Sequence, residues 1–149
     1  MIPIAVRTAF ADVVPEVQAR MNAFRWSDQE RVARMLATDP SAWSDEDVDI
    51  VMAHAQTTLG GPETFKWVLP AFLDRFIENP EHGWMTISSV LAEKLDHAGF
   101  DEWPHAQRAA ILEMLAKWLT AQATLFPDDP THDPTEENAV LRRWFEART

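Results

Sequence analysis

The stretch FKWVLPAFLDRFI, residues 65–77, is the most apolar helical segment of this chain. Its large apolar residues recur at helical spacing and fall on one face: Phe65, Leu69, Phe72, Leu73, Phe76 and Ile77. Pro70 lies in the middle, where it removes one backbone donor and disfavours the α conformation at Leu69. We therefore expect a kinked central core helix, in which Pro70 bends the helix and does not line a site.

Start signals on both sides of this stretch predict further helices. Ser27 and Ser44 each stand three residues before an acid, which is the arrangement of a capping box. Asp101, followed by Pro104, predicts the start of a later helix. No segment shows the alternation of a half-buried strand. The predicted fold class is all-α, a single-domain bundle of six to seven helices with a kinked central helix.

The end of the chain has a different composition. Three prolines and three aspartates crowd residues 127–134, which predicts an extended linker between a helical domain at 1–126 and a C-terminal docking helix at 135–149. That last helix carries four apolar residues: Val140, Leu141, Trp144 and Phe145. An undocked helix of this length is marginal in water, so we expect it to pack onto its own domain or onto a second copy.

Composition removes several classes of protein. The 149 residues include no cysteine, which excludes disulfides, thiolate metal sites and thiol nucleophiles. No apolar run reaches the length of a membrane span, and the first residues lack the pattern of a signal peptide. We expect a cytoplasmic protein without membrane association.

The chain is acidic throughout. Its net charge of −11 comes from 13 basic and 24 acidic residues that are spread evenly along the sequence. Such a surface works against direct binding of nucleic acid. Solubility alone accounts for an even spread, and the two sharper interpretations are a basic protein partner and mimicry of nucleic-acid charge.

One set of residues has the types and spacing of a metal site. Glu93 and His97 are four residues apart, and Glu102 and His105 are three apart. A dinuclear bundle site needs two Glu-x-x-His pairs and two further glutamates, and the second pair is missing here. Neither a nucleophile elbow nor a phosphate-binding loop occurs. We predict no metal, no cofactor and no catalytic residue, and keep these four residues as weak metal candidates.

Seven tryptophans give a second set of candidates. Most stand beside caps or on apolar faces, where aromatic rings fill helix junctions, and we expect core positions for Trp43, Trp67, Trp103 and Trp118. Trp26 and Trp84 instead adjoin polar breaks in the sequence. We therefore expect these two to be exposed and to serve as partner-binding candidates, as aromatics do at binding hot spots.

The central stretch also carries a resemblance. Residues 65–73, preceded by Trp43 and followed by the helical segment 107–112, resemble a family of small uncharacterised bacterial all-helical proteins with an aromatic-x-x-Leu-Pro-Ala-aromatic core motif. The resemblance spans roughly residues 8–120. It implies a helical fold, and no activity or site residue comes with it.

These observations rank three hypotheses. The leading one is a non-catalytic bacterial protein of the immunity or regulatory kind, whose acidic surface binds a protein partner of basic character. The alternatives are a small helical metal-dependent hydrolase that uses the four metal candidates and an acidic nucleic-acid mimic. A homo-oligomer is compatible with each of them.

Overall fold

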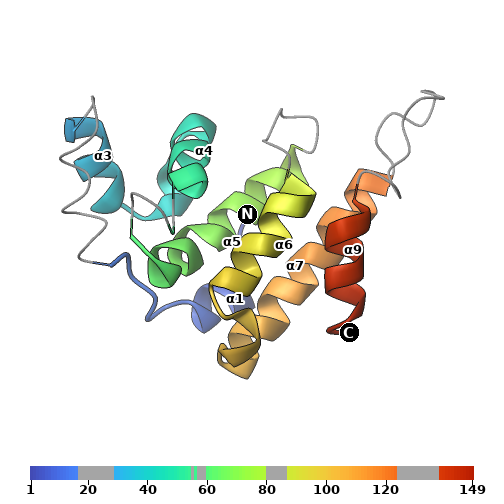
Figure 1. Ribbon diagram of the computed structural model, residues 1–149. Helices are drawn as coiled ribbons and strands as arrows, with labels where there is room; N and C mark the ends of the chain where they lie inside the picture. Colours follow the sequence, from blue (N-terminus) through green and yellow to red (C-terminus); the bar gives the residue numbers. More distant parts are fainter. Residues whose placement is uncertain (17–28, 55, 57–59, 80–86, 124–137) are drawn as a thin grey trace. The chain divides into compact units, whose positions relative to one another are not determined.

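The computed structural model describes residues 1–16, 29–54, 56, 60–79, 87–123 and 138–149 (Figure 1). In these ranges it has seven α-helices and no strand, so the predicted all-α class is confirmed. The α-helices are α1 (Ile4–Ala9), α3 (Gln29–Leu36), α4 (Asp45–His54), α5 (Pro62–Glu78), α6 (Ile87–His97), α7 (His105–Ala123) and α9 (Ala139–Glu146). Two short 3-10 helices, η2 (Pro40–Ala42) and η3 (Phe100–Glu102), precede α4 and α7.

The chain divides into two compact units, Met1–Phe72 and Leu73–Thr149. The division falls inside α5, which continues as one helix through Pro70. The bend expected at Pro70 stays a prediction, as do the boundaries of the predicted helical domain. The predicted linker at 127–134 and the start of the predicted docking helix at 135 lie outside the described residues.

One predicted helix cap is confirmed by the structure, and another is wrong. The Ser44 hydroxyl accepts the Asp47 N–H at 3.2 Å, and α4 begins directly after it, as predicted. Ser27 lies outside the described residues. Asp101 does not cap α7, because it lies inside η3 and the chain then runs extended at Trp103. The Pro104 carbonyl instead accepts the N–H groups of Gln107 and Arg108, so α7 begins at His105.

In the first unit, a carboxylate from a distant part of the chain caps α5. Glu16 accepts the N–H of Gly61 at 3.0 Å and the N–H of Glu63 at 2.9 Å. The N–H of Glu16 in turn donates to the Thr64 hydroxyl at 3.1 Å. These bonds satisfy donors that a helix N-terminus leaves unpaired and place negative charge at the positive end of the helix dipole. They hold the segment after α1 against the start of α5.

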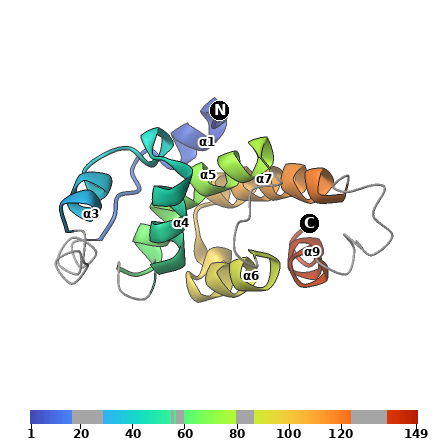
Figure 2. The same cartoon turned by 90° about the horizontal axis from the view of Figure 1, so that it is seen from above.

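In the second unit, α9 packs beside α6 and α7 (Figures 1 and 2), so the C-terminal helix docks within its own chain. Leu141 is fully buried, and the Trp144 ring meets Phe100 at 4.9 Å between centroids. The expectation that all four apolar residues dock is wrong at Val140, which is 43% exposed. Val140 lies one position before Leu141, about 100° around the helix from the docked face.

Arg148 fixes the end of α9. Its guanidinium donates to both carboxylate oxygens of Asp101, at 2.9 and 3.1 Å, and to Asp96 at 3.1 Å. The same group lies 4.0 Å from the centre of the Trp144 ring, whose indole N–H donates to Asp96 at 2.7 Å. Planar bidentate pairing of this kind gives an ion pair a defined geometry.

Of the helices in the described ranges, none combines the length and the apolar character that crossing a membrane would require.

Candidate functional site

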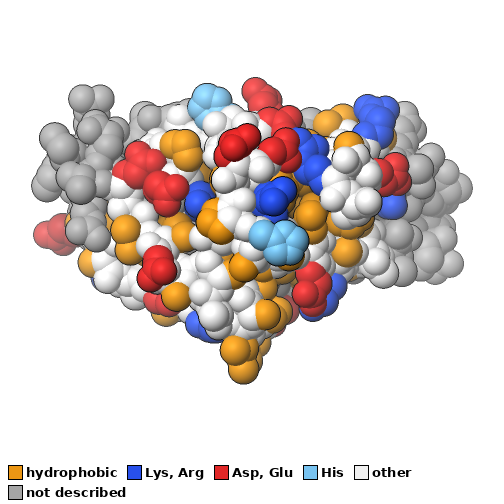
Figure 3. All heavy atoms as spheres, turned by 90° about the horizontal axis from the view of Figure 1, so that it is seen from below, with side chains coloured by type: hydrophobic (Ala, Val, Ile, Leu, Met, Phe, Trp, Pro, Cys, Tyr) orange, Lys and Arg blue, Asp and Glu red, His pale blue; other side chains and the backbone are white. Residues whose placement is uncertain are grey.

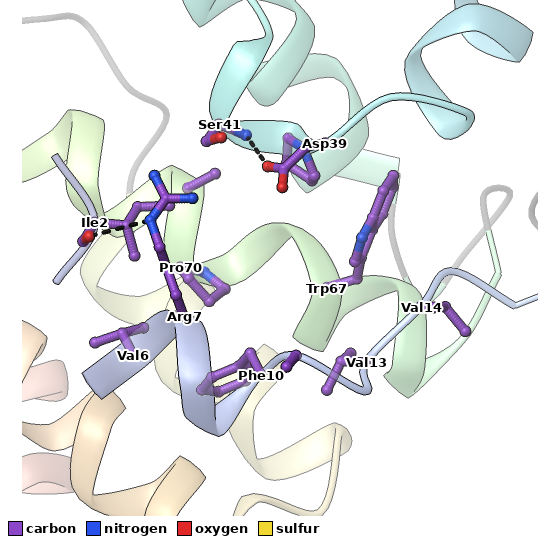
Figure 4. A pocket seen from close by; sticks show the side chains of 13 residues that line it. Ile2, Val6, Arg7, Phe10, Val13, Val14, Asp39, Ser41, Trp67 and Pro70 are labelled. Atoms are coloured by element: carbon purple, nitrogen blue, oxygen red, sulfur yellow. Dashed lines mark hydrogen bonds between the residues drawn. The ribbon is translucent and has the colours of Figure 1, made fainter. Parts of the chain in front are cut away.

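The first unit contains a cavity of about 300 Å³ between α1, η2 and the middle of α5 (Figure 4). We call it the Arg7 cavity. Thirteen residues line it: Ile2, Val6, Arg7, Phe10, Ala11, Val13, Val14, Asp39, Pro40, Ser41, Trp67, Pro70 and Ala71.

One wall of the cavity comes from the N-terminal segment. Ile2, Val6, Phe10 and Val13 recur every three or four residues, so they share one face of α1 and of the turns that follow it. All four are at most 8% exposed. This periodicity is visible in the sequence, and it is the signal from which the wall could have been predicted.

The facing wall comes from α5. Trp67, Pro70 and Ala71 lie on the side of this helix that meets the cavity. The Pro70 ring forms part of this wall, while the expectation that Pro70 lines no functional site stays a prediction. A proline ring suits this position, since it offers apolar surface and no N–H that would need a partner.

The Trp67 ring is held in place by a second tryptophan. Trp43 meets it edge to face, with ring centroids 5.2 Å apart and planes at 79°. The Trp43 indole N–H donates to the Thr38 carbonyl at 3.2 Å, and its ring is buried. Edge-to-face pairs of this kind are stabilising beyond the area that they bury. One side of the cavity is therefore a supported aromatic surface.

The polar side of the cavity begins with Arg7. Its side chain extends from α1 along the cavity toward η2 (Figure 4). The Nε–H group donates to the Ile2 carbonyl at 3.4 Å. Within the ranges that the structure describes, the outer N–H groups of the Arg7 guanidinium form no ion pair.

Asp39 supplies the second charge. Its carboxylate accepts the Ser41 N–H at 2.8 Å. The Ser41 hydroxyl, this N–H and the positive charge of Arg7 together lower the pKa of Asp39 below its ordinary value, although partial burial acts in the other direction. Asp39 is therefore a carboxylate at neutral pH, and its position is set by the η2 turn that it caps.

The lining of the Arg7 cavity combines apolar side chains with two charged groups. The lining residues include no histidine, cysteine or lysine that could act as a base or a nucleophile near neutral pH. A concave apolar surface with a few fixed polar groups is typical of ligand sites. The cavity offers apolar walls, one guanidinium and one carboxylate.

The four metal candidates are not brought together. Glu93 and His97 on α6, Glu102 in η3 and His105 on α7 are all exposed. Across the described ranges, no group of three or more acidic or histidine side chains is placed to hold a metal ion. Glu93 lies near a cation instead: burial lowers the pKa of Lys94, and the charge of Glu93 partly offsets this.

The tryptophan predictions have mixed outcomes. Trp26 and Trp84 lie outside the described residues, so their role as partner-binding candidates stays a prediction. Core positions are confirmed for three buried rings: Trp43, Trp103 and Trp118. Trp67 was expected in the core and is instead half-buried at the Arg7 cavity.

Charged side chains are exposed on the face that Figure 3 displays. Acidic groups stand among basic and apolar ones there. This is compatible with the even spread of acids along the sequence and with the net charge of −11.

Comparison of the chain with protein-family models, with curated proteins and with solved structures found no match. The resemblance to a family of small bacterial helical proteins stays a prediction. The residue three positions before Leu69 is Lys66 and not an aromatic one, so this chain departs from the aromatic-x-x-Leu spacing of that motif.

Proposed function

We propose that this protein is a non-catalytic binding partner of another protein, of the immunity or regulatory kind in bacteria, and that the Arg7 cavity is its recognition site. The observation that carries the proposal is a cavity whose wall combines apolar side chains with a guanidinium and a carboxylate. The cytoplasmic location expected from the sequence is part of the same proposal.

The size of the cavity favours a protein ligand over a large cofactor. Small-molecule sites range from about 300 to about 1,000 Å³, and a cavity of about 300 Å³ is at the lower limit. One anchoring side chain fits a space of this size. Protein interfaces commonly depend on a few such anchors seated in desolvated pockets.

Exposed apolar residues extend the surface beyond the cavity. Val14 lines the cavity and is 61% exposed, and Ile4 on α1 is 83% exposed. Residues flanking the anchor of a partner could pack against Val14. The net charge of −11 further favours a partner with basic residues, because opposite charge speeds association.

The test is selection from a peptide library with variants that fill the cavity or leave it open. Ala11 lines the cavity and is exposed, so Ala11→Trp places a large ring at the mouth without disturbing the core. Ala33→Trp is the matched control, since Ala33 is exposed on α3 and does not line the cavity.

We expect peptides selected on the native protein to bind Ala33→Trp normally and Ala11→Trp at least about tenfold more weakly, a loss of about 1.4 kcal/mol. Equal binding to both variants would show that the cavity is not the recognition site. Conversion of a bound peptide to a product would contradict the non-catalytic assignment.

A further inference from the structure

We propose that the Arg7 cavity recognises the free C-terminal residue of a partner protein, with an apolar side chain inside the cavity, its carboxylate on Arg7 and its backbone N–H on Asp39. This inference rests on the proposed function and names the part of the partner that is bound.

The guanidinium of Arg7 indicates that the ligand carries a carboxylate. A guanidinium presents parallel N–H groups that match the two oxygens of a carboxylate. The outer N–H groups of Arg7 form no ion pair with the described residues, and the bond from Nε to Ile2 sets the direction of the side chain.

The net negative charge of the protein restricts which part of a partner can supply that carboxylate. A chain with a net charge of −11 repels an acidic peptide, so Asp and Glu side chains are poor candidates. A chain end brings a carboxylate without any acidic side chain and tolerates basic residues before it. It also places the carboxylate on the same residue as an apolar side chain, which suits the apolar wall beside Arg7.

The carboxylate of Asp39 indicates that the ligand also carries a hydrogen-bond donor close to its own carboxylate. It is ionised at neutral pH and lies near enough to Arg7 for the two charges to interact. In a C-terminal residue the backbone N–H and the carboxylate are attached to the same α-carbon. A ligand with an acceptor and a donor on the same carbon atom can therefore use both charges of the cavity at once.

The apolar walls select the side chain. Phe10, Trp67 and Pro70 offer aromatic and ring surface, and Ile2 and Val6 offer branched aliphatic surface. At about 300 Å³ the cavity accommodates one residue such as leucine or phenylalanine rather than an extended segment.

The experiment compares two forms of one peptide by calorimetry with the full chain. The probes are N-acetylated Lys-Ala-Ala-Leu with a free carboxylate and the same peptide with a C-terminal amide. We expect the free acid to bind at least about tenfold more tightly, as the loss of a charge-assisted bond implies. Equal affinities would overturn the proposal.

Arginine variants provide the second arm. In Arg7→Gln the preference for the free acid should fall to about one, and Arg7→Lys should keep part of it, because it retains the charge and loses the planar fork. Arg34→Gln is the matched control, since Arg34 is exposed on α3 of the same unit and does not line the cavity. An unchanged preference in Arg7→Gln would overturn the proposal.

Binding of free leucine distinguishes a site for the C-terminus of a chain from a site for a free amino acid. If free leucine binds more tightly than the peptide, the site recognises an amino acid and the proposal fails. If library peptides without a free C-terminus bind the cavity as well as the free-acid peptide does, this inference fails while the proposed function stands. If Ala11→Trp weakens the binding of no peptide, the proposed function fails.

Discussion

The carboxylate of Glu16 accepts the backbone N–H of Gly61 at 3.0 Å, across 45 residues of sequence. A Cβ atom added to Gly61 would lie 2.9 Å from Glu16 Oε1, which is closer than such atoms approach. Gly61 therefore leaves room for a carboxylate that caps α5 and holds the segment carrying Val13 and Val14. Both of those residues line the Arg7 cavity, so this contact supports the proposed site.

A double-mutant cycle tests the contact. Glu16→Ala should lower the free energy of unfolding by about 0.5–2 kcal/mol, the usual cost of a lost helix cap. Gly61→Ala should cost about 1 kcal/mol in the native background and clearly less when Glu16 is already alanine, because the clash is then gone. Chemical unfolding of the four proteins measures both values. Strictly additive losses would show that the two residues do not interact.

The docking face of α9 is tested by two neighbouring residues. Leu141 is fully buried, so Leu141→Ala should destabilise the protein by about 2–5 kcal/mol. Val140 is 43% exposed, and Val140→Ala should stay within about 0.5 kcal/mol. Thermal unfolding of the two variants measures both losses of stability. Losses of similar size would mean that the helix docks through a different face.

Arg148 should stabilise α9 through its charge and its planar shape together. Arg148→Ala removes the pairing to Asp101 and the contact with the Trp144 ring, and we expect a loss of about 1–2 kcal/mol that becomes smaller at high salt. Arg143→Ala, at an exposed position of the same helix, is the control. A loss in the control as large as that in Arg148→Ala would refute the role of Arg148.

Asp39 should contribute to stability above acidic pH. Its pKa in the folded protein lies below the ordinary value of about 3.8, so its stabilising effect is present above that value and is lost as the pH falls through the folded pKa. The difference in melting temperature between the native protein and Asp39→Asn should therefore shrink between about pH 7 and about pH 2.5. A difference that stays constant over this range would contradict the interaction.

The sequence predicts features that depend on neighbouring residues. The Ser44 cap, the presence of a helix around residues 65–77 and the all-α class follow from local capping and periodicity, and all are confirmed. Asp101 shows the limit of this reasoning. It has the residue type of a cap, but η3 and the extended Trp103 separate it from α7, and no local pattern announces that turn.

The candidate site depends on contacts between distant parts of the chain. Arg7 and Asp39 line the same cavity only because the fold brings α1 and η2 to it, and Trp67 lines it with a ring that Trp43 supports. Residue type and spacing instead indicated Glu93, His97, Glu102 and His105, which are exposed and, among the described residues, belong to no group that could hold a metal ion. The apolar spacing from Ile2 to Val13 was the one local signal of the cavity.

The central claim, that the Arg7 cavity is the recognition site, is tested most directly by nuclear magnetic resonance of the indole N–H groups. Trp67 lines the cavity, while Trp118 and Trp144 lie in the second unit. When the free-acid Lys-Ala-Ala-Leu peptide is added, we predict a saturable shift of the Trp67 signal and none at Trp118 or Trp144. Binding that leaves the Trp67 signal in place, or that moves the signals of the second unit instead, would contradict the account.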